Sequence, residues 1–108
     1  MDFENNDLNK ILIKNPPATF YGRVKGTSMI DAGIDDGDLL VIDKSLERRN
    51  NSLAVCCLNG EFTLKYIKRA GERLWLMPAN PDFEPIEVKS EDEFTIWGIV
   101  SWIVKKTY

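Results

Sequence analysis

The stretch that decides the fold is a glycine- and aspartate-rich segment around a single serine. It reads Gly26-Thr27-Ser28-Met29-Ile30-Asp31-Ala32-Gly33-Ile34-Asp35-Asp36-Gly37-Asp38-Leu39-Leu40. The apolar run continues through Val41 and Ile42, and this pattern predicts a tightly turned loop that leads into a buried strand. Ser28 therefore lies on backbone shaped by turns. By itself, a serine in such surroundings is most often a turn or capping residue.

A lysine farther along the chain gives this serine a second interpretation. The segment Gly60-Glu61-Phe62-Thr63-Leu64-Lys65-Tyr66-Ile67 alternates apolar and polar side chains as a strand does, and Lys65 falls in register with Thr63. A serine on a glycine-rich turn and a lysine in a mostly apolar strand are the two parts of a serine–lysine dyad. The alternative is an edge-strand lysine whose amine reaches solvent, and the bare sequence fits it equally well.

Such a dyad requires an unusual lysine. A free lysine, with a pKa near 10.4, is neutral in only about one molecule in 2,500 at pH 7. Burial without a compensating carboxylate lowers the pKa and makes the amine available as a base. Lys65 could then take the proton of the Ser28 hydroxyl, and the backbone N–H groups of Thr27 and Ser28 could form an oxyanion hole if a short helix begins at Met29.

Composition and net charge exclude several kinds of site and partner. A chain of 108 residues with a formal net charge of −3 predicts one domain that does not wrap nucleic acid by itself, so we expect no direct DNA binding. Cys56 and Cys57 are adjacent and would point to opposite faces of a strand, so we expect no mutual disulfide and a reduced compartment. The chain has no histidine, so a Ser-His-Asp triad and an imidazole zinc site are excluded. We expect no metal, no cofactor, no membrane span and a cytoplasmic location.

The remaining pattern predicts a mainly β, single small domain with little helix, built as a β-sandwich or partly open barrel. Asp7 could cap a short helix with Leu8, Ile11 and Leu12 on one face. Asn59-Gly60 is the strongest hairpin signal. The domain spans 7–108 after a flexible tail at 1–6, and its expected strands are Thr19–Lys25, Leu39–Asp43, Leu53–Leu58, Glu61–Lys68, Arg73–Met77, a short strand with Ile86 and Val88, and Phe94–Val104.

Two further segments have open interpretations. Asp35, Asp36 and Asp38 could suggest a calcium loop, but the EF-hand spacing is missing and turn chemistry is favoured. Phe94–Val104 is apolar on both faces, so we expect it to be covered, either as a central strand or at a two-fold interface. In a regular strand Trp97 and Trp102 would face opposite sides.

Several of these segments together resemble the LexA/UmuD family of self-cleaving serine–lysine peptidases, from about Asp7 to the C-terminus. They are Gly26-Thr27-Ser28-Met29, Gly33 to Asp43, Gly60 to Lys65, Pro78-Ala79-Asn80-Pro81 and Trp97-Gly98-Ile99-Val100. The resemblance implies the C-terminal peptidase-like fold of that family, with Ser28 and Lys65 as the catalytic pair. Thr27 stands where UmuD relatives commonly carry aspartate, and Asn51-Ser52-Leu53 replaces a usual Gly-Asp.

Within the family, Asp7 to Phe20 resembles UmuD most. The resemblance implies a homodimer that serves as an SOS-response accessory subunit of an error-prone Y-family translesion polymerase (UmuC-like), with a RecA filament as co-protease for the uncleaved form. Family members cut themselves at an Ala-Gly or Cys-Gly bond in an N-terminal arm, and no such dipeptide precedes Ser28, so we expect the processed, UmuD′-like form. The alternatives are the C-terminal self-cleavage and dimerisation domain of a LexA-like or phage repressor, or a peptidase that acts in trans.

Overall fold

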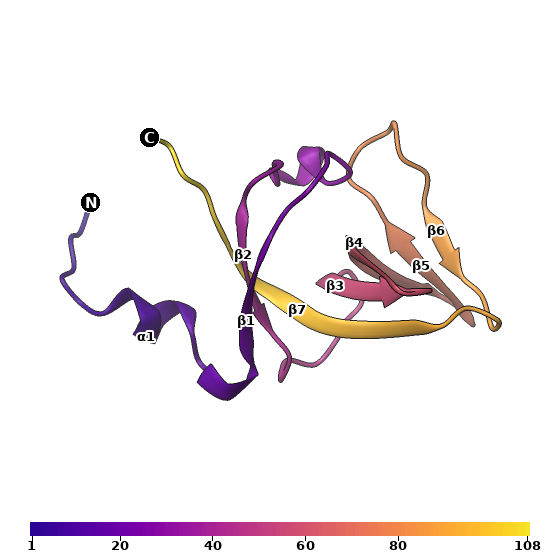
Figure 1. Ribbon diagram of the computed structural model, residues 1–108, viewed down its shortest axis with the longest axis horizontal. Coiled ribbons are helices and arrows are strands. Elements are labelled where there is room, and N and C mark those ends of the chain that lie inside the picture. Colours follow the sequence, from indigo (N-terminus) through magenta and orange to yellow (C-terminus); the bar gives the residue numbers. More distant parts are fainter.

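The last strand of the chain lies in the middle of the sheet. In the computed structural model, which describes residues 1–108, seven antiparallel strands form one open sheet in the order β1-β2-β7-β3-β4-β5-β6 (Figure 1). The mainly β class with little helix is confirmed. The strand bounds are β1 Thr19–Arg23, β2 Leu39–Asp43, β3 Leu53–Leu58, β4 Glu61–Ala70, β5 Arg73–Met77, β6 Ile86–Val88 and β7 Phe94–Val104.

Strand β7 joins two halves of the sheet. It pairs with β2 on one side and with β3 on the other, and no pairing joins β2 directly to β3. The register shifts once along each of these pairings, between Val41 and Ile42 and between Val55 and Cys56. The prediction that Trp97 and Trp102 face opposite sides assumed that successive side chains of a regular strand alternate between the two faces. These irregularities interrupt that alternation.

The β3–β4 hairpin forms as its turn residues predict. Asn59 and Gly60 have φ angles of 50° and 85°, the left-handed values that a two-residue hairpin turn requires. Leu58 and Glu61 are paired directly across the turn. The turn residue Asn59 also accepts from the N–H of Glu93 and so ties the hairpin to the chain just before β7. The turn fixes the register of the pair, and Lys65 occupies the second arm as predicted.

The short helix at the N-terminus is present, but its apolar face is open. Helix α1 (Leu8–Leu12) is capped by Asp7, whose side chain accepts from the N–H of Asn9 at 3.0 Å. None of its residues is buried, and Leu8 is 62% exposed. Figure 1 shows α1 projecting beyond the sheet. Residues 1–6 have no helix or strand and are exposed; the flexible tail remains a prediction.

Apolar packing occurs on both sides of β7. One cluster consists of Ala54, Cys56, Ile67 and Leu76. The buried residues around the serine loop and β2 are Met29, Ile34, Leu40, Val41 and Ile42. Gly98 of β7 allows the close approach of Ile42, since a Cβ atom at this glycine would lie 2.5 Å from the Ile42 Cγ2 atom.

The two interpretations of Phe94–Val104 apply to different parts of the strand: the central-strand one fits its first part, and cover of its last part by a second copy stays a prediction. Its first part is an interior strand, and Gly98 is buried. Its last part pairs only with β2, and Trp102, Ile103 and Val104 are 43%, 37% and 38% exposed. The strand extends beyond the reach of β3, whose last partner on this side is Ile99, so the end of β7 lacks cover. None of the helices is long and apolar enough to cross a membrane.

Candidate serine–lysine site

The loop that carries Ser28 is shaped by glycine conformations and a short 3-10 helix. Gly26 and Gly33 have φ angles of 86° and 75°, which L side chains rarely adopt. Between them lies the 3-10 helix η2 (Ile30–Ala32), which starts two residues after the serine. Met29 is 2% exposed and anchors the loop in the core.

A second loop holds the serine segment from the side of β5. Ala79 donates its N–H to the carbonyl oxygen of Ser28 at 2.8 Å and accepts from the N–H of Asp31 at 2.7 Å. The side chain of Asn80 donates to the carbonyl oxygen of Thr27 at 2.9 Å. The Pro78–Pro81 segment therefore fixes the backbone immediately before and after Ser28.

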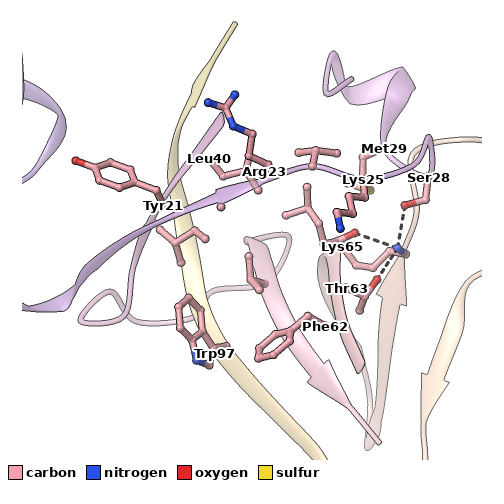
Figure 2. A pocket seen from close by; sticks show the side chains of 15 residues that line it. Tyr21, Arg23, Lys25, Ser28, Met29, Leu40, Phe62, Thr63, Lys65 and Trp97 are labelled. Carbon is pink, nitrogen blue, oxygen red and sulfur yellow. Dashed lines mark hydrogen bonds between the residues drawn. The ribbon is translucent and has the colours of Figure 1, made fainter. Parts of the chain in front are cut away.

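Strand β4 brings Lys65 to this serine. Lys65 is 6% exposed, and its Nζ atom lies 2.9 Å from the Ser28 Oγ atom (Figure 2). The same nitrogen lies 2.8 Å from the Thr63 Oγ1 atom and 3.0 Å from the carbonyl oxygen of Leu64. The solvent-reaching alternative for Lys65 is therefore wrong, because the amine is turned inward and bonded to three protein oxygens.

These three contacts define how the amine can act. A protonated lysine has three N–H donors, and each can serve one of these oxygens. A neutral amine has two N–H groups and one lone pair. If the two N–H groups of the neutral amine donate to Thr63 and Leu64, its lone pair is directed at the Ser28 hydroxyl. This is the geometry that a general base needs.

The surroundings of Lys65 favour its neutral form. Burial lowers the pKa of the Lys65 amine, with a smaller opposing effect from Cys56. None of the ion pairs of the chain involves Lys65, so no carboxylate restores the charged form. Burial raises the pKa of the Cys56 thiol to about 11, so this neighbour stays protonated at neutral pH.

Unused backbone donors lie beside the serine. The N–H groups of Thr27 and Ser28 donate no hydrogen bond within the chain. They are the two groups that the sequence suggested for an oxyanion hole. The expected helix begins at Ile30 rather than Met29, because the N–H of Ile30 is the first that turns back, to the carbonyl of Thr27.

A groove leads away from the dyad. It has a volume of about 490 Å³, and most of its lining residues are hydrophobic. In Figure 2, Ser28 and Lys65 lie at the right, and the rings of Phe62 and Trp97 lie below and to the left of them. The rings of Phe62 and Trp97 meet edge to face with centroids 6.0 Å apart, and Phe62 is 65% exposed. The edge strand β1 contributes Tyr21 to Arg23.

Sequence reasoning missed Thr63 and Asn80 as parts of the site. The signal for Thr63 was its position two residues before Lys65, which puts both side chains on one face of β4. Asn80 lies in a loop, and no periodicity could place it against Thr27. The three aspartates belong to the turn before β2: Asp36 accepts from the N–H of Gly26, and Asp38 from the N–H of Asp35.

The fold and the site together define a small β domain with a buried lysine hydrogen-bonded to a serine on a turn, an arrangement typical of serine–lysine peptidases. Residues 3–101 match the model of a family described as Peptidase S24-like. The chain belongs to this family, whose members are self-cleaving serine peptidases, and the LexA/UmuD resemblance is confirmed.

The relatives that this chain resembles are repressors. It is 45% identical over 94 residues to the LexA repressor of Acidithiobacillus ferrooxidans, covering 84% of this chain and 46% of the relative. It is 42% identical over 93 residues to LexA repressor 1 of Pseudomonas syringae pv. tomato, covering 85% and 46%. With the LexA repressor of Bordetella avium the identity is 43% over 83 residues, covering 77% and 39%. The chain spans about half the length of these relatives or less.

Proposed function

We propose that this chain is the C-terminal self-cleavage domain of a LexA-like repressor, in which Ser28 is the nucleophile and Lys65 the general base. The observation that carries the proposal is the 2.9 Å contact between a buried lysine amine and a serine hydroxyl. The family supports a peptidase reaction, and the relatives named above support a repressor as the whole protein.

The reaction follows from the contacts. Neutral Lys65 takes the hydroxyl proton of Ser28 while the serine oxygen attacks a peptide carbonyl carbon. The N–H groups of Thr27 and Ser28 stabilise the negative charge on the carbonyl oxygen. Lys65 returns the proton to the leaving amine, which leaves an acyl ester on Ser28, and a water molecule then hydrolyses this ester with Lys65 again as the base.

The substrate is an extended peptide segment. The groove beside the dyad is mostly apolar, and the edge strand β1 along it has a backbone edge that pairs with no other strand. The family resemblance adds an Ala-Gly or Cys-Gly bond as the scissile bond. We place Phe62 and Trp97 at the far end of the groove, where they would contact apolar side chains away from the scissile bond.

Partners follow from the same assignment. We propose a homodimer and activation of the uncleaved repressor by a RecA filament. The polymerase-accessory role and its UmuC-like partner have no support among relatives that are named repressors, which favour the LexA-like alternative. Relatives that are named repressors are also at odds with our expectation of no direct DNA binding. We assign DNA contact to the part of the repressor that lies outside the matched half.

The test is cleavage in trans. The substrate is the full-length LexA repressor of Pseudomonas syringae, with the serine aligned to Ser28 replaced by alanine so that it cannot cut itself. Incubated with the present chain at pH 9 to 10, it should yield two fragments by mass spectrometry, with the new ends at an Ala-Gly or Cys-Gly bond.

Matched variants assign the residues. Ser28→Ala and Lys65→Ala should abolish the fragments. Ser90→Ala and Lys68→Ala, which change exposed residues of the same two types, should leave the rate unchanged. Fragments that persist with Ser28→Ala would contradict the dyad, and an intact substrate with every variant would contradict the peptidase assignment.

A further inference from the structure

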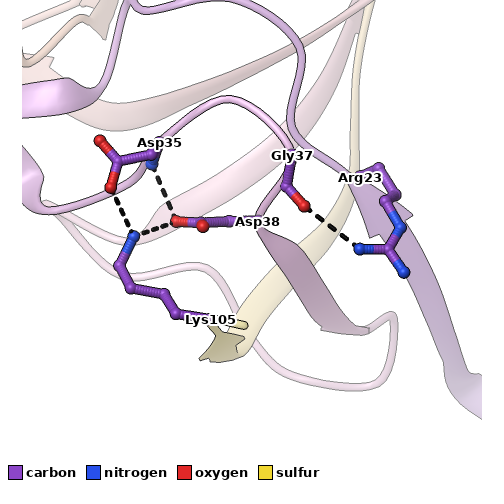
Figure 3. A network of polar contacts seen from close by, with 5 residues as sticks. All are labelled: Arg23, Asp35, Gly37, Asp38 and Lys105. Carbon is purple, nitrogen blue, oxygen red and sulfur yellow. Dashed lines mark hydrogen bonds and ion pairs between the residues drawn. The ribbon is translucent and has the colours of Figure 1, made fainter. Parts of the chain in front are cut away.

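Most of the ion pairing in this chain is concentrated on one lysine after the last strand. Lys105 follows β7, and its Nζ atom lies 2.8 Å from the Asp35 Oδ2 atom and also contacts the Asp38 Oδ2 atom (Figure 3). The third and last ion pair of the chain joins Arg73 to Glu87 far from this site. The next residue, Lys106, has no hydrogen bond or ion pair, so the contact belongs to one position of the C-terminal segment.

Asp38 makes this contact more than a surface ion pair. Its side chain is only 9% exposed, and the same carboxylate oxygen accepts from the N–H of Asp35 at 2.8 Å. Hydrogen bonding to Lys105, followed by the N–H of Asp35, lowers the pKa of Asp38 below 3.8. Without Lys105, a mostly buried carboxylate would keep a single donor, and the turn would have to rearrange to hydrate it.

The turn that contains these carboxylates also carries the approach to the serine. The N–H of Val24 donates to the carbonyl of Asp38 at 3.0 Å, and the N–H of Gly37 donates back to the carbonyl of Val24 at 2.8 Å. The side chain of Asp36 accepts from the N–H of Gly26 at 2.7 Å. Gly26 lies two residues before Ser28, so these bonds connect the turn to the backbone that leads to the serine.

We propose that Lys105 is a positioning residue for the peptidase reaction: it joins the end of β7 to the turn at Asp35–Asp38 and thereby holds the backbone that sets the Ser28 oxygen against Lys65. The inference rests on the proposed function for its catalytic consequence. Its structural consequence, a changed serine loop, is independent of any activity. A displacement of about 1 Å in a reacting group can cost up to 100-fold in rate, so an effect of about tenfold on kcat is expected here.

Three variants of the full chain test the proposal. Lys105→Ala removes the contact, Lys105→Arg keeps a cation that can reach both carboxylates, and Lys106→Ala is the matched control. The first measurement is the ¹⁵N–¹H spectrum of each folded protein, well below its melting temperature. Lys105→Ala should shift the amide resonances of Gly26, Thr27 and Ser28, whereas Lys105→Arg and Lys106→Ala should leave them near those of the parent chain.

The second measurement is trans cleavage of the inactivated repressor under conditions where kcat and KM separate. Lys105→Ala should lower kcat with little change in KM, and Lys105→Arg should restore kcat. Unchanged resonances and kcat in Lys105→Ala would overturn the proposal, even if the variant melts at a lower temperature, because the contact would then serve stability alone. If the parent chain itself does not cleave, the proposed function fails, and the resonances still decide whether Lys105 holds the loop.

Discussion

The side-chain nitrogen of Asn80 lies 2.9 Å from the carbonyl oxygen of Thr27, the residue directly before the serine. These residues come from different loops, and their contact fixes the direction of the peptide that links Thr27 to Ser28. The N–H on this peptide is that of Ser28, one of the two donors without a partner in the chain. Asn80 therefore orients a donor of the proposed oxyanion hole through the peptide that precedes Ser28.

Replacing Asn80 with alanine should reduce trans cleavage about tenfold, mainly through kcat. Complete loss of an oxyanion-hole donor costs about 100- to 1,000-fold in kcat. The effect is smaller here because the Ser28 N–H remains and only its orientation is less firmly held. The measurement is steady-state cleavage of the inactivated repressor. Asp82→Ala, an exposed change in the same loop, is the control and should cleave normally. Equal rates for the two variants would show that the Asn80 contact does not matter for the reaction.

The pH dependence of cleavage should follow Lys65. Burial lowers the pKa of this amine from 10.5, so the active neutral form appears as the pH rises through the lowered value. The cleavage rate should therefore reach its plateau at a lower pH than a free lysine would give. Because the depressed group binds its proton more weakly in the folded state, stability should also rise with pH between the folded pKa and 10.5. Cleavage rates and melting temperatures, measured from pH 6 to 11, check both slopes. The raised pKa of Cys56 acts in the opposite direction between about pH 9 and 11, so the comparison is with Lys65→Met, which keeps Cys56. A parent chain whose melting temperature rises no more with pH than that of Lys65→Met would contradict a buried, desolvated lysine.

Gly98→Ala should destabilise the domain by about 1–3 kcal/mol through overpacking. The added Cβ atom would lie 2.5 Å from the Ile42 Cγ2 atom, in a strand held on both sides. Gly22→Ala is the matched control, because its Cβ atom would lie 3.2 Å from another atom of the same isoleucine in an edge strand that can shift. Urea unfolding should show the larger loss for Gly98→Ala, and the reverse order would contradict the tight contact between β7 and β2.

Trp102→Glu should yield a folded monomer if the end of β7 lies at a two-fold interface. The side chain is 43% exposed in the single chain, so a charge there need not disturb the core, but it would be buried without a partner between two copies. Light scattering gives the mass, and circular dichroism verifies the fold. Phe83→Glu, at the same 43% exposure in a different region, should leave the mass unchanged. A dimer that survives Trp102→Glu would place the interface elsewhere.

Much of the fold could be predicted because local chemistry and tertiary structure agree. Leu39–Asp43 and Leu53–Leu58 are apolar runs between turns, and both are strands with the predicted bounds. Asn59-Gly60 specifies one type of turn, so the hairpin and the strand that carries Lys65 followed from two residues.

What could not be predicted depends on the order of strands in space. The pattern of Phe94–Val104 indicates burial, but only the sheet order shows that β3 covers its first part and leaves Trp102 open. The contact of Lys65 with Ser28 was inferred from a paired motif, whereas Asn80 and Lys105 reach the serine loop through contacts between distant segments that carry no periodic signal.

The central position of β7 also bears on when the site can assemble. Ser28 belongs to the half of the sheet built from β1 and β2, and Lys65 belongs to the half built from β3 to β6; the only strand that pairs with both halves is the last to be synthesised. A growing chain on the ribosome that has produced Ser28, Lys65 and the Pro78–Pro81 loop still lacks the strand that pairs with both halves. Pairing of β7 with β2 on one side and β3 on the other is therefore the step at which the two halves of the sheet, and with them Ser28 and Lys65, become parts of one structure.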